Sequence, residues 1–103
     1  MHVDGHLIPL DSITSLTHGL AGTKSGEILI LQRDRDGFIA QGQSAHQNSI
    51  FFLEMSFDQR VLASLSDDTD PKRVQIALWD LSYLHTTKRL VLKRRFSLVK
   101  LES

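Results

Sequence analysis

Residues 51–81 read FFLEMSFDQRVLASLSDDTDPKRVQIALWDL, and this stretch decides the fold. Apolar residues dominate residues 51–57 and 61–63, and a polar or acidic turn follows each run. The large apolar residues Val74, Ile76 and Leu78 then stand at every second position up to Trp79. This period of two is typical of a half-buried strand, because successive side chains point to opposite faces of a sheet. The stretch therefore predicts three antiparallel strands joined by two hairpin turns.

The same stretch resembles a WD repeat, the unit that forms one blade of a β-propeller. Ser56-Phe57-Asp58 matches the turn of the repeat, Leu62-Ala63-Ser64 matches its second strand, and Trp79-Asp80-Leu81 matches the end of its third strand. Ala45-His46 stands where the family has Gly-His. The acidic loop 67–73 is longer than the loop of the family. The resemblance implies an all-β fold of antiparallel, four-stranded propeller-type blades.

The resemblance also implies structural roles for particular side chains. His46, Ser64 and Trp79 fall on the buried hydrogen-bond chain that holds a blade together in this family, and Asp80 completes the Trp-Asp ending. The fourth member of that chain would be an Asp, for which Asp68 and Asp70 are the alternatives. These residues are therefore expected to stabilise the fold.

A weaker copy of the pattern lies upstream. In residues 13–31, Leu20-Ala21-Gly22-Thr23 aligns with residues 62–65, and Leu31 stands where the second copy has Trp79. Internal repeats of roughly 40 to 50 residues are typical of propeller blades. Divergent repeats of this kind are also similar to those of large WD-repeat scaffold proteins, including ciliary and axonemal ones.

The pattern divides the chain into four parts without requiring a helix. Strands are expected near residues 13–16, 19–23, 27–32 and 38–43, then in the second blade, and last at 89–93 after a turn at 83–88. The expected parts are a leader (1–10), a divergent first blade (11–44), a second WD-like blade (45–93), and a basic tail or start of a further blade (94–103).

Length sets a limit on the propeller. A closed propeller usually needs about four or more blades of roughly 40 to 45 residues each, whereas 103 residues supply about two. The chain is thus expected to be a piece or isoform of a longer protein, or to associate with itself to complete a propeller. An isoform with little independent function is a further alternative.

Composition points to a cytoplasmic protein. The content of 41% hydrophobic and 23% charged residues is ordinary for a soluble globular protein, and the chain has no cysteine, so disulfide and thiol chemistry are excluded. The start of the chain lacks the organisation of a signal peptide, and no apolar run is long enough for a membrane span. The resemblance extends the expected location to the cytoskeleton and the cilium.

Charge is unevenly distributed although the net charge is zero. Six of the 12 Lys and Arg residues lie in residues 86–103, beside a single Glu. Such a tail suits acidic partners, but it also fits the solvated face of an outer strand. Only Phe96 is interleaved with its basic residues, so a stacking surface for nucleic acid is missing and nucleic acid is not the expected partner.

No pattern in the sequence predicts catalysis, a cofactor or a metal. Lys24-Ser25 resembles the end of a phosphate-binding loop, but the required glycines and helix are missing. Asp34 and Asp36 make half of a calcium loop, and a tight turn is the better interpretation. The histidines show no ligand spacing for zinc, and no motif supports an activated serine.

The sequence therefore predicts a non-catalytic protein–protein interaction scaffold that binds other proteins through loops and blade edges. The alternative is a basic-tailed module that binds RNA or an anionic membrane. The candidate partner-binding residues are Asp67, Asp68, Asp70, Lys72, Arg73, Lys93, Arg94 and Arg95.

Overall fold

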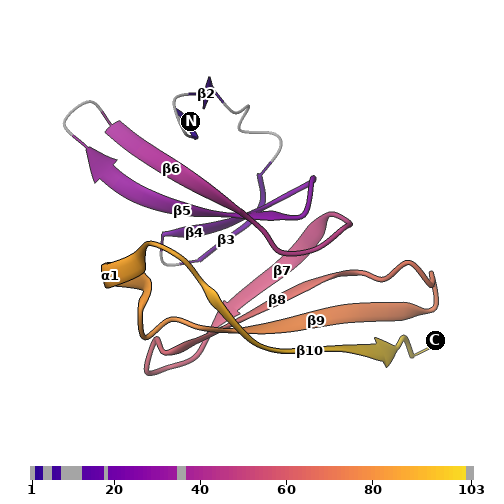
Figure 1. Cartoon of the computed structure of the whole chain (residues 1–103). Coiled ribbons are helices and arrows are strands. Elements are labelled where there is room, and N and C mark those ends of the chain that lie inside the picture. Colours follow the sequence, from indigo (N-terminus) through magenta and orange to yellow (C-terminus); the bar gives the residue numbers. More distant parts are fainter. Residues whose placement is uncertain (1, 4–5, 8–12, 18, 35–36, 102–103) are drawn as a thin grey trace.

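The computed structural model describes residues 2–3, 6–7, 13–17, 19–34 and 37–101. These residues form an all-β fold of two sheets that pack against each other (Figure 1). The all-β class predicted from the alternating apolar pattern is therefore confirmed.

The second sheet contains the stretch that decided the fold. Its strands are β7 (Ile50–Met55), β8 (Val61–Asp67), β9 (Arg73–Asp80) and β10 (Val91–Val99). Each strand pairs antiparallel with the next along the chain, so the sheet order is β10-β9-β8-β7. The turn after β7 is fixed by Ser56, whose hydroxyl donates to Asp58 Oδ1 at 2.7 Å and accepts from the backbone N–H of Val61 at 3.0 Å.

The first sheet has the same antiparallel succession of neighbouring strands. It consists of β3 (Ile13–Thr17), β4 (Leu20–Thr23), β5 (Glu27–Asp34) and β6 (Gly37–Ser44), close to the four predicted ranges. Two short strands, β1 (His2–Val3) and β2 (His6–Leu7), extend it, with β1 parallel to β6. The predicted leader thus supplies strands to this sheet. The predicted turn at 34–37 joins the paired residues Asp34 and Gly37, and residues 35–36 lie outside the described residues.

Two predictions near the C-terminal end were wrong. The last strand was expected at residues 89–93, but β10 runs from Val91 to Val99, so the boundary after residue 93 divides one continuous strand. No helix was expected, yet residues 84–87 form a short helix, α1 (Leu84–Thr87), which ends at Lys88 with a positive φ of 59°. Residues 94–99 are therefore the outer strand of the second sheet and not a separate tail.

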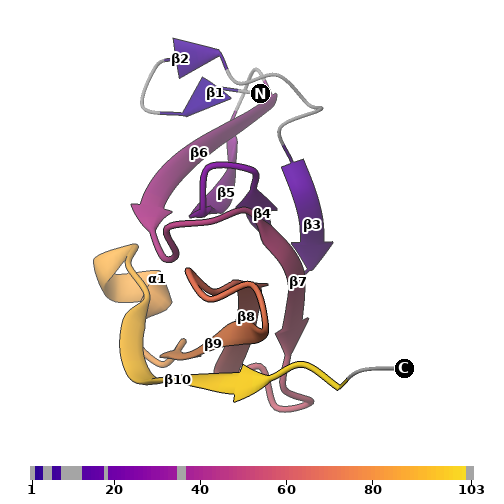
Figure 2. The ribbon, with the colours of Figure 1, turned by 90° about the vertical axis from the view of Figure 1, so that its right-hand side faces the viewer.

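The two sheets meet along one edge strand of each, β3 and β7. Strands β3 and β7 contact each other, and the Thr14 hydroxyl donates to the backbone carbonyl of Ile50. Figure 2 shows these two strands side by side. Behind them lies one hydrophobic core that both sheets share. Its buried members are Leu20, Ile28, Ile30, Ala45, Ile50, Leu53, Leu62, Ala77, Trp79, Leu81 and Leu90.

Gly26 anchors the connection between the sheets. Its carbonyl accepts hydrogen bonds from the backbone N–H groups of Ala45 (3.0 Å) and His46 (2.9 Å). Its φ is +85°, and a Cβ atom at this position would lie 2.0 Å from the His46 carbonyl oxygen. The turn before β5 therefore requires glycine for both backbone conformation and space. This contact fixes where the chain leaves the first sheet and where His46 enters the second.

On the outer side, Gln43 of β6 ties the two sheets together. Its side-chain amide donates to the carbonyl of Leu90 and accepts from the N–H of the same residue, both at 2.8 Å. The segment that leads into β10 is thus bound to strand β6 of the first sheet.

Replacing Gly26 with Ala is expected to lower the free energy of unfolding by at least about 2 to 4 kcal/mol, because a strained φ and a steric clash add together. Urea unfolding followed by circular dichroism measures the change. Gly19→Ala is the matched control, since Gly19 has a similar φ of +80° but its Cβ would find the nearest atom only at 3.9 Å. Equal losses of unfolding free energy in the two variants would show that the steric clash with His46 does not add to the cost of replacing Gly26.

Candidate functional site

The buried polar centre of the second sheet is a hydrogen-bonded row of side chains from separate segments. Trp79 Nε1 of β9 donates to Ser64 Oγ of β8 at 2.8 Å, and Ser64 Oγ lies 2.7 Å from His46 Nε2 in the connection between the sheets. All three side chains are buried, with at most 5% of their surface exposed. The structure thus brings together the three residues that the resemblance singled out.

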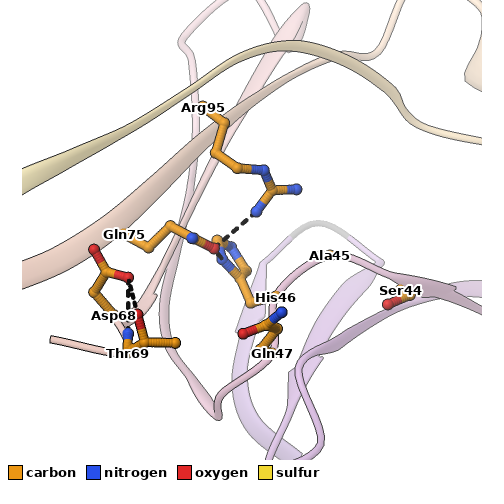
Figure 3. A pocket seen from close by; sticks show the side chains of 8 residues that line it. All are labelled: Ser44, Ala45, His46, Gln47, Asp68, Thr69, Gln75 and Arg95. Carbon is orange, nitrogen blue, oxygen red and sulfur yellow. Dashed lines mark hydrogen bonds between the residues drawn. The ribbon is translucent and has the colours of Figure 1, made fainter.

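The row continues to two further side chains. His46 Nδ1 lies 2.7 Å from Gln75 Oε1 of β9, and Arg95 Nη1 of β10 donates to the same oxygen at 2.8 Å (Figure 3). We call these five residues, Trp79, Ser64, His46, Gln75 and Arg95, the Trp79 network. The prediction of Asp68 or Asp70 as the fourth member was wrong, because the amide of Gln75 occupies that position.

Chemistry at both ends of the Trp79 network fixes the positions of its protons. An indole N–H only donates, so Ser64 Oγ must accept from Trp79 and has its own proton free for His46 Nε2. At the other end, a guanidinium only donates, so the atom it contacts on Gln75 is the amide oxygen. His46 Nδ1 must then carry the proton that this oxygen accepts. The contacts therefore place a proton on His46 Nδ1, and the neutral tautomer with this proton lets Nε2 accept from Ser64 Oγ.

The surroundings of His46 favour this neutral form. Burial is the main cause that lowers the pKa of His46 below the ordinary value of 6.5, and the positive charge of Arg95 lowers it further. The hydrogen bonds to Gln75 and Ser64 act in the opposite direction but are outweighed. Protonation would place a buried positive charge beside Arg95 and would take away the acceptor of the Ser64 proton.

Arg95 closes the Trp79 network at the surface. Its guanidinium carbon lies 5.9 Å from the centre of the Trp79 ring, within the range of a cation–π contact. The neighbouring residue Arg94 points to the opposite face of β10 and lies 5.3 Å from the centre of the Phe96 ring. The two arginines thus have different surroundings, although they are adjacent in sequence.

A pocket of about 360 Å³ opens beside the Trp79 network. We call it the Arg95 pocket. Figure 3 shows how its walls come from the connection between the sheets, from the loop after β8, and from strands β9 and β10. Its lining residues are Ser44, Ala45, His46, Gln47, Asp68, Thr69, Gln75 and Arg95.

The acidic side chains of the loop between β8 and β9 form hydrogen bonds and ion pairs with the loop itself and with the C-terminal part of the chain. Asp68 accepts from the Ser97 hydroxyl at 2.7 Å and from the backbone N–H of Thr69 at 2.7 Å, and these hydrogen bonds lower the pKa of its carboxyl group. Asp70 accepts from the N–H of Lys72 at 2.9 Å, and Asp67 pairs with Lys100 at 2.8 Å. The loop is therefore an ordered wall of the Arg95 pocket.

The other predicted residues are distributed over separate surfaces. Arg73 Nε lies 3.9 Å from Asp70 Oδ2 in an exposed ion pair. Lys93 lies at an irregularity in the pairing of β10 with β9. The side chain of Ser82 and then its backbone N–H, which lies 2.8 Å from Asp80 Oδ1, lower the pKa of the Asp80 carboxyl group. The structure does not join Lys93, Arg94 and Arg95 into a single basic patch.

The side of the second sheet that faces away from the first sheet carries mostly apolar side chains, together with the charged residues Glu54 and Arg94. Phe52, Leu65, Ile76 and Phe96 are paired in register across β7, β8, β9 and β10, so their side chains share this side, which we call the open face. Phe52 is 45% exposed, and Leu98, further along β10 on the same side, is 51% exposed. Large apolar side chains exposed together are typical of a surface that binds another protein.

Two residues of this site were not identified from the sequence. Gln75 stands in an alternating strand, where nothing distinguishes it from other polar residues, and Gly26 was interpreted only as a turn residue. Strand register is what identifies Gln75. Position 75 pairs with Ser66 and Ser97, so its side chain lies on the side of the sheet that faces the core.

The described ranges contain no group of three or more His, Asp or Glu side chains placed to hold a metal ion. Within the same ranges, no helix is long and apolar enough to cross a membrane. Lys24-Ser25 lies in the turn after β4, where the hydroxyls of Thr23 and Ser25 are 2.9 Å apart.

Replacing Ser64 with Ala is expected to destabilise the protein by about 2 to 4 kcal/mol, because Trp79 Nε1 and His46 Nε2 both lose their buried partner. Ser66→Ala is the matched control. Ser66 is equally buried on the same strand, but its hydroxyl donates only to the neighbouring Asp67 carbonyl at 3.2 Å. Urea unfolding of both variants measures the difference, and equal costs would contradict a structural role for the Trp79 network.

Stability is expected to fall as the pH decreases from about 6.5 towards 5, because unfolded His46 binds a proton in this range while folded His46 resists it. His46 contributes its full stabilisation of the fold at pH values above the pKa that it has in the unfolded chain. This stabilisation is lost as the pH falls through the lower pKa that His46 has in the folded protein. Unfolding in urea at a series of pH values measures the slope. His46→Asn should reduce the slope, and an equal slope in this variant and the wild-type protein would contradict the prediction.

Comparison with known proteins found no match among family models, curated proteins or solved structures. The function must therefore be inferred from the Trp79 network, the Arg95 pocket and the open face.

Proposed function

We propose that this protein is a non-catalytic protein–protein interaction scaffold and forms part of a WD-type propeller. The observation that carries the proposal is the buried contact of His46, Ser64 and Trp79 within a sheet of four consecutive antiparallel strands. These are the residues and the strand order that the resemblance implies. The Trp79 network holds three strands and a connection in register, which is a structural role.

The arrangement leaves surfaces for partners outside the Trp79 network. The loop between β8 and β9 is ordered by its own hydrogen bonds, so it presents a fixed shape without a large entropic cost on binding. The open face presents half-exposed aromatic and aliphatic side chains, and the outer strand β10 has a free edge. Rigid sheets with surface loops are well suited to bind other proteins.

We further propose that the open face takes part in self-association. Burying Phe52 and Leu98 against a second copy would remove large apolar side chains from water, which is the main favourable contribution to association. The basic residues of β10 discourage pairing at its edge, because charged side chains on an edge strand oppose strand addition. Contact through the open face is therefore favoured over contact through the edge.

The alternative function, binding of a polyanion, stays a prediction. It requires Lys93, Arg94 and Arg95 to act on one ligand, whereas Arg94 and Arg95 point to opposite faces of β10. Binding of RNA or of an anionic membrane would weaken steeply with salt, since it depends on counterion release, and a protein interface would weaken much less.

The solution mass, measured by light scattering coupled to size exclusion, is expected to be a discrete multiple of 11.6 kDa and to increase with concentration. Phe52→Glu should shift the protein towards 11.6 kDa, because a buried unpaired carboxylate opposes the contact. Phe57→Glu is the matched control, since Phe57 is fully exposed in the turn after β7.

Thermal unfolding by circular dichroism establishes that both variants fold. A wild-type protein that stays at 11.6 kDa at the highest soluble concentration would contradict self-association through the open face. Equal dissociation of the Phe52→Glu and Phe57→Glu variants would also contradict it, because Phe57 lies outside that face.

A further inference from the structure

Among the residues that the structure describes, no carboxylate forms a salt bridge with Arg95. The salt bridges of the described residues pair Arg73 with Asp70 and Lys100 with Asp67, and neither includes Arg95. The guanidinium instead donates one N–H to the neutral amide oxygen of Gln75 and lies over the Trp79 ring. Because a guanidinium has five N–H donors, several remain for a ligand.

The side chain of Arg95 is held in place before any ligand arrives. Gln75 Oε1 is itself fixed by His46, and His46 is fixed by Ser64 and by the backbone contact with Gly26. Figure 3 shows the guanidinium reaching from β10 towards Gln75 and the His46 ring. A guanidinium ordered in this way loses little conformational entropy on binding.

The polar groups around Arg95 suit a small anion. Ser44, Gln47 and Gln75 line the Arg95 pocket and offer neutral hydroxyl and amide donors. Asp68 is the only acidic residue of the lining. Its carboxylate already accepts hydrogen bonds from Ser97 and Thr69, so its lone pairs are largely used.

We propose that the Arg95 pocket binds a carboxylate side chain, Asp or Glu, of a partner protein. This inference rests on the proposed protein-binding function and gives the chemical class of the group that is recognised. A carboxylate accepts two parallel hydrogen bonds from a guanidinium and carries a single negative charge. A phosphate dianion would strengthen both the attraction to Arg95 and the repulsion from Asp68, so the choice rests on shape: a planar carboxylate matches the planar guanidinium.

The test uses the full chain and a hexaglutamate peptide as the probe, with hexaglutamine as the uncharged peptide. Trp79 is the single tryptophan and lies under Arg95, so its fluorescence reports on the Arg95 pocket. Side-chain ¹⁵N–¹H spectra of Arg95 and Trp79 locate the contact. Hexaglutamate should change these signals in a saturable manner at about 0.15 M salt, where interactions between exposed charges more than about 8 Å apart are largely screened. Hexaglutamine should leave the signals unchanged.

Arg95→Gln should weaken hexaglutamate binding about tenfold or more, as is expected when a charged hydrogen bond is lost. Arg94→Gln is the matched control: it removes the same charge from the adjacent residue on the opposite face and should change the affinity by less than about twofold. Asp68→Asn should strengthen binding by removing the like charge. Urea unfolding of each variant shows whether the fold is retained.

Equal weakening by Arg95→Gln and Arg94→Gln would overturn the proposal, because it would show diffuse attraction to a basic strand. A stronger response to inorganic phosphate than to hexaglutamate at equal concentration would overturn the assignment of a carboxylate. Failure of the wild-type protein to bind hexaglutamate would also overturn it. The proposed scaffold function is tested separately by the solution mass of the Phe52→Glu variant, which does not involve the Arg95 pocket.

Discussion

The rest of the structure depends on the buried hydrogen bonds that Ser64 Oγ makes with Trp79 and His46. Ser64 lies in the middle of β8, Trp79 lies near the end of β9, and His46 belongs to no strand. One hydroxyl therefore holds two strands and the connection between the sheets at fixed separations. Each of the three groups is buried, so leaving any of them unpaired is costly, and this makes the arrangement specific as well as stable.

The same centre joins the second sheet to the first. His46 can reach Ser64 only because its backbone is bound to Gly26, and Gly26 is the position in the first sheet where a Cβ atom would collide with that backbone. Gln43 makes a second link, on the outer side of the sheets. The packing of the two sheets is thus set by polar contacts of defined geometry in addition to the shared hydrophobic core.

Much of the fold follows from the sequence because alternation and turn residues are local signals. Strands β3 to β9 were predicted close to their observed ranges, and the resemblance led to His46, Ser64 and Trp79. Gln75 was missed because the choice of Asp68 or Asp70 relied on residue type, while the actual partner depends on strand register. The basic residues were also interpreted as the solvated face of an outer strand, which β10 is, but its end was placed too early because pairing with β9 over eight positions, and not the local pattern, sets the extent of the strand.

Arg95 connects the buried Trp79 network to the protein surface. Its charge is one of the causes that lower the pKa of His46, and the same charge is what attracts a carboxylate into the Arg95 pocket. A bound carboxylate would offset the repulsion between Arg95 and protonated His46, so it would raise the pKa of His46. By linkage, acidification would then strengthen carboxylate binding while it weakens the empty fold. A neutral amide at position 75 makes this coupling possible, because a carboxylate in its place would already neutralise Arg95.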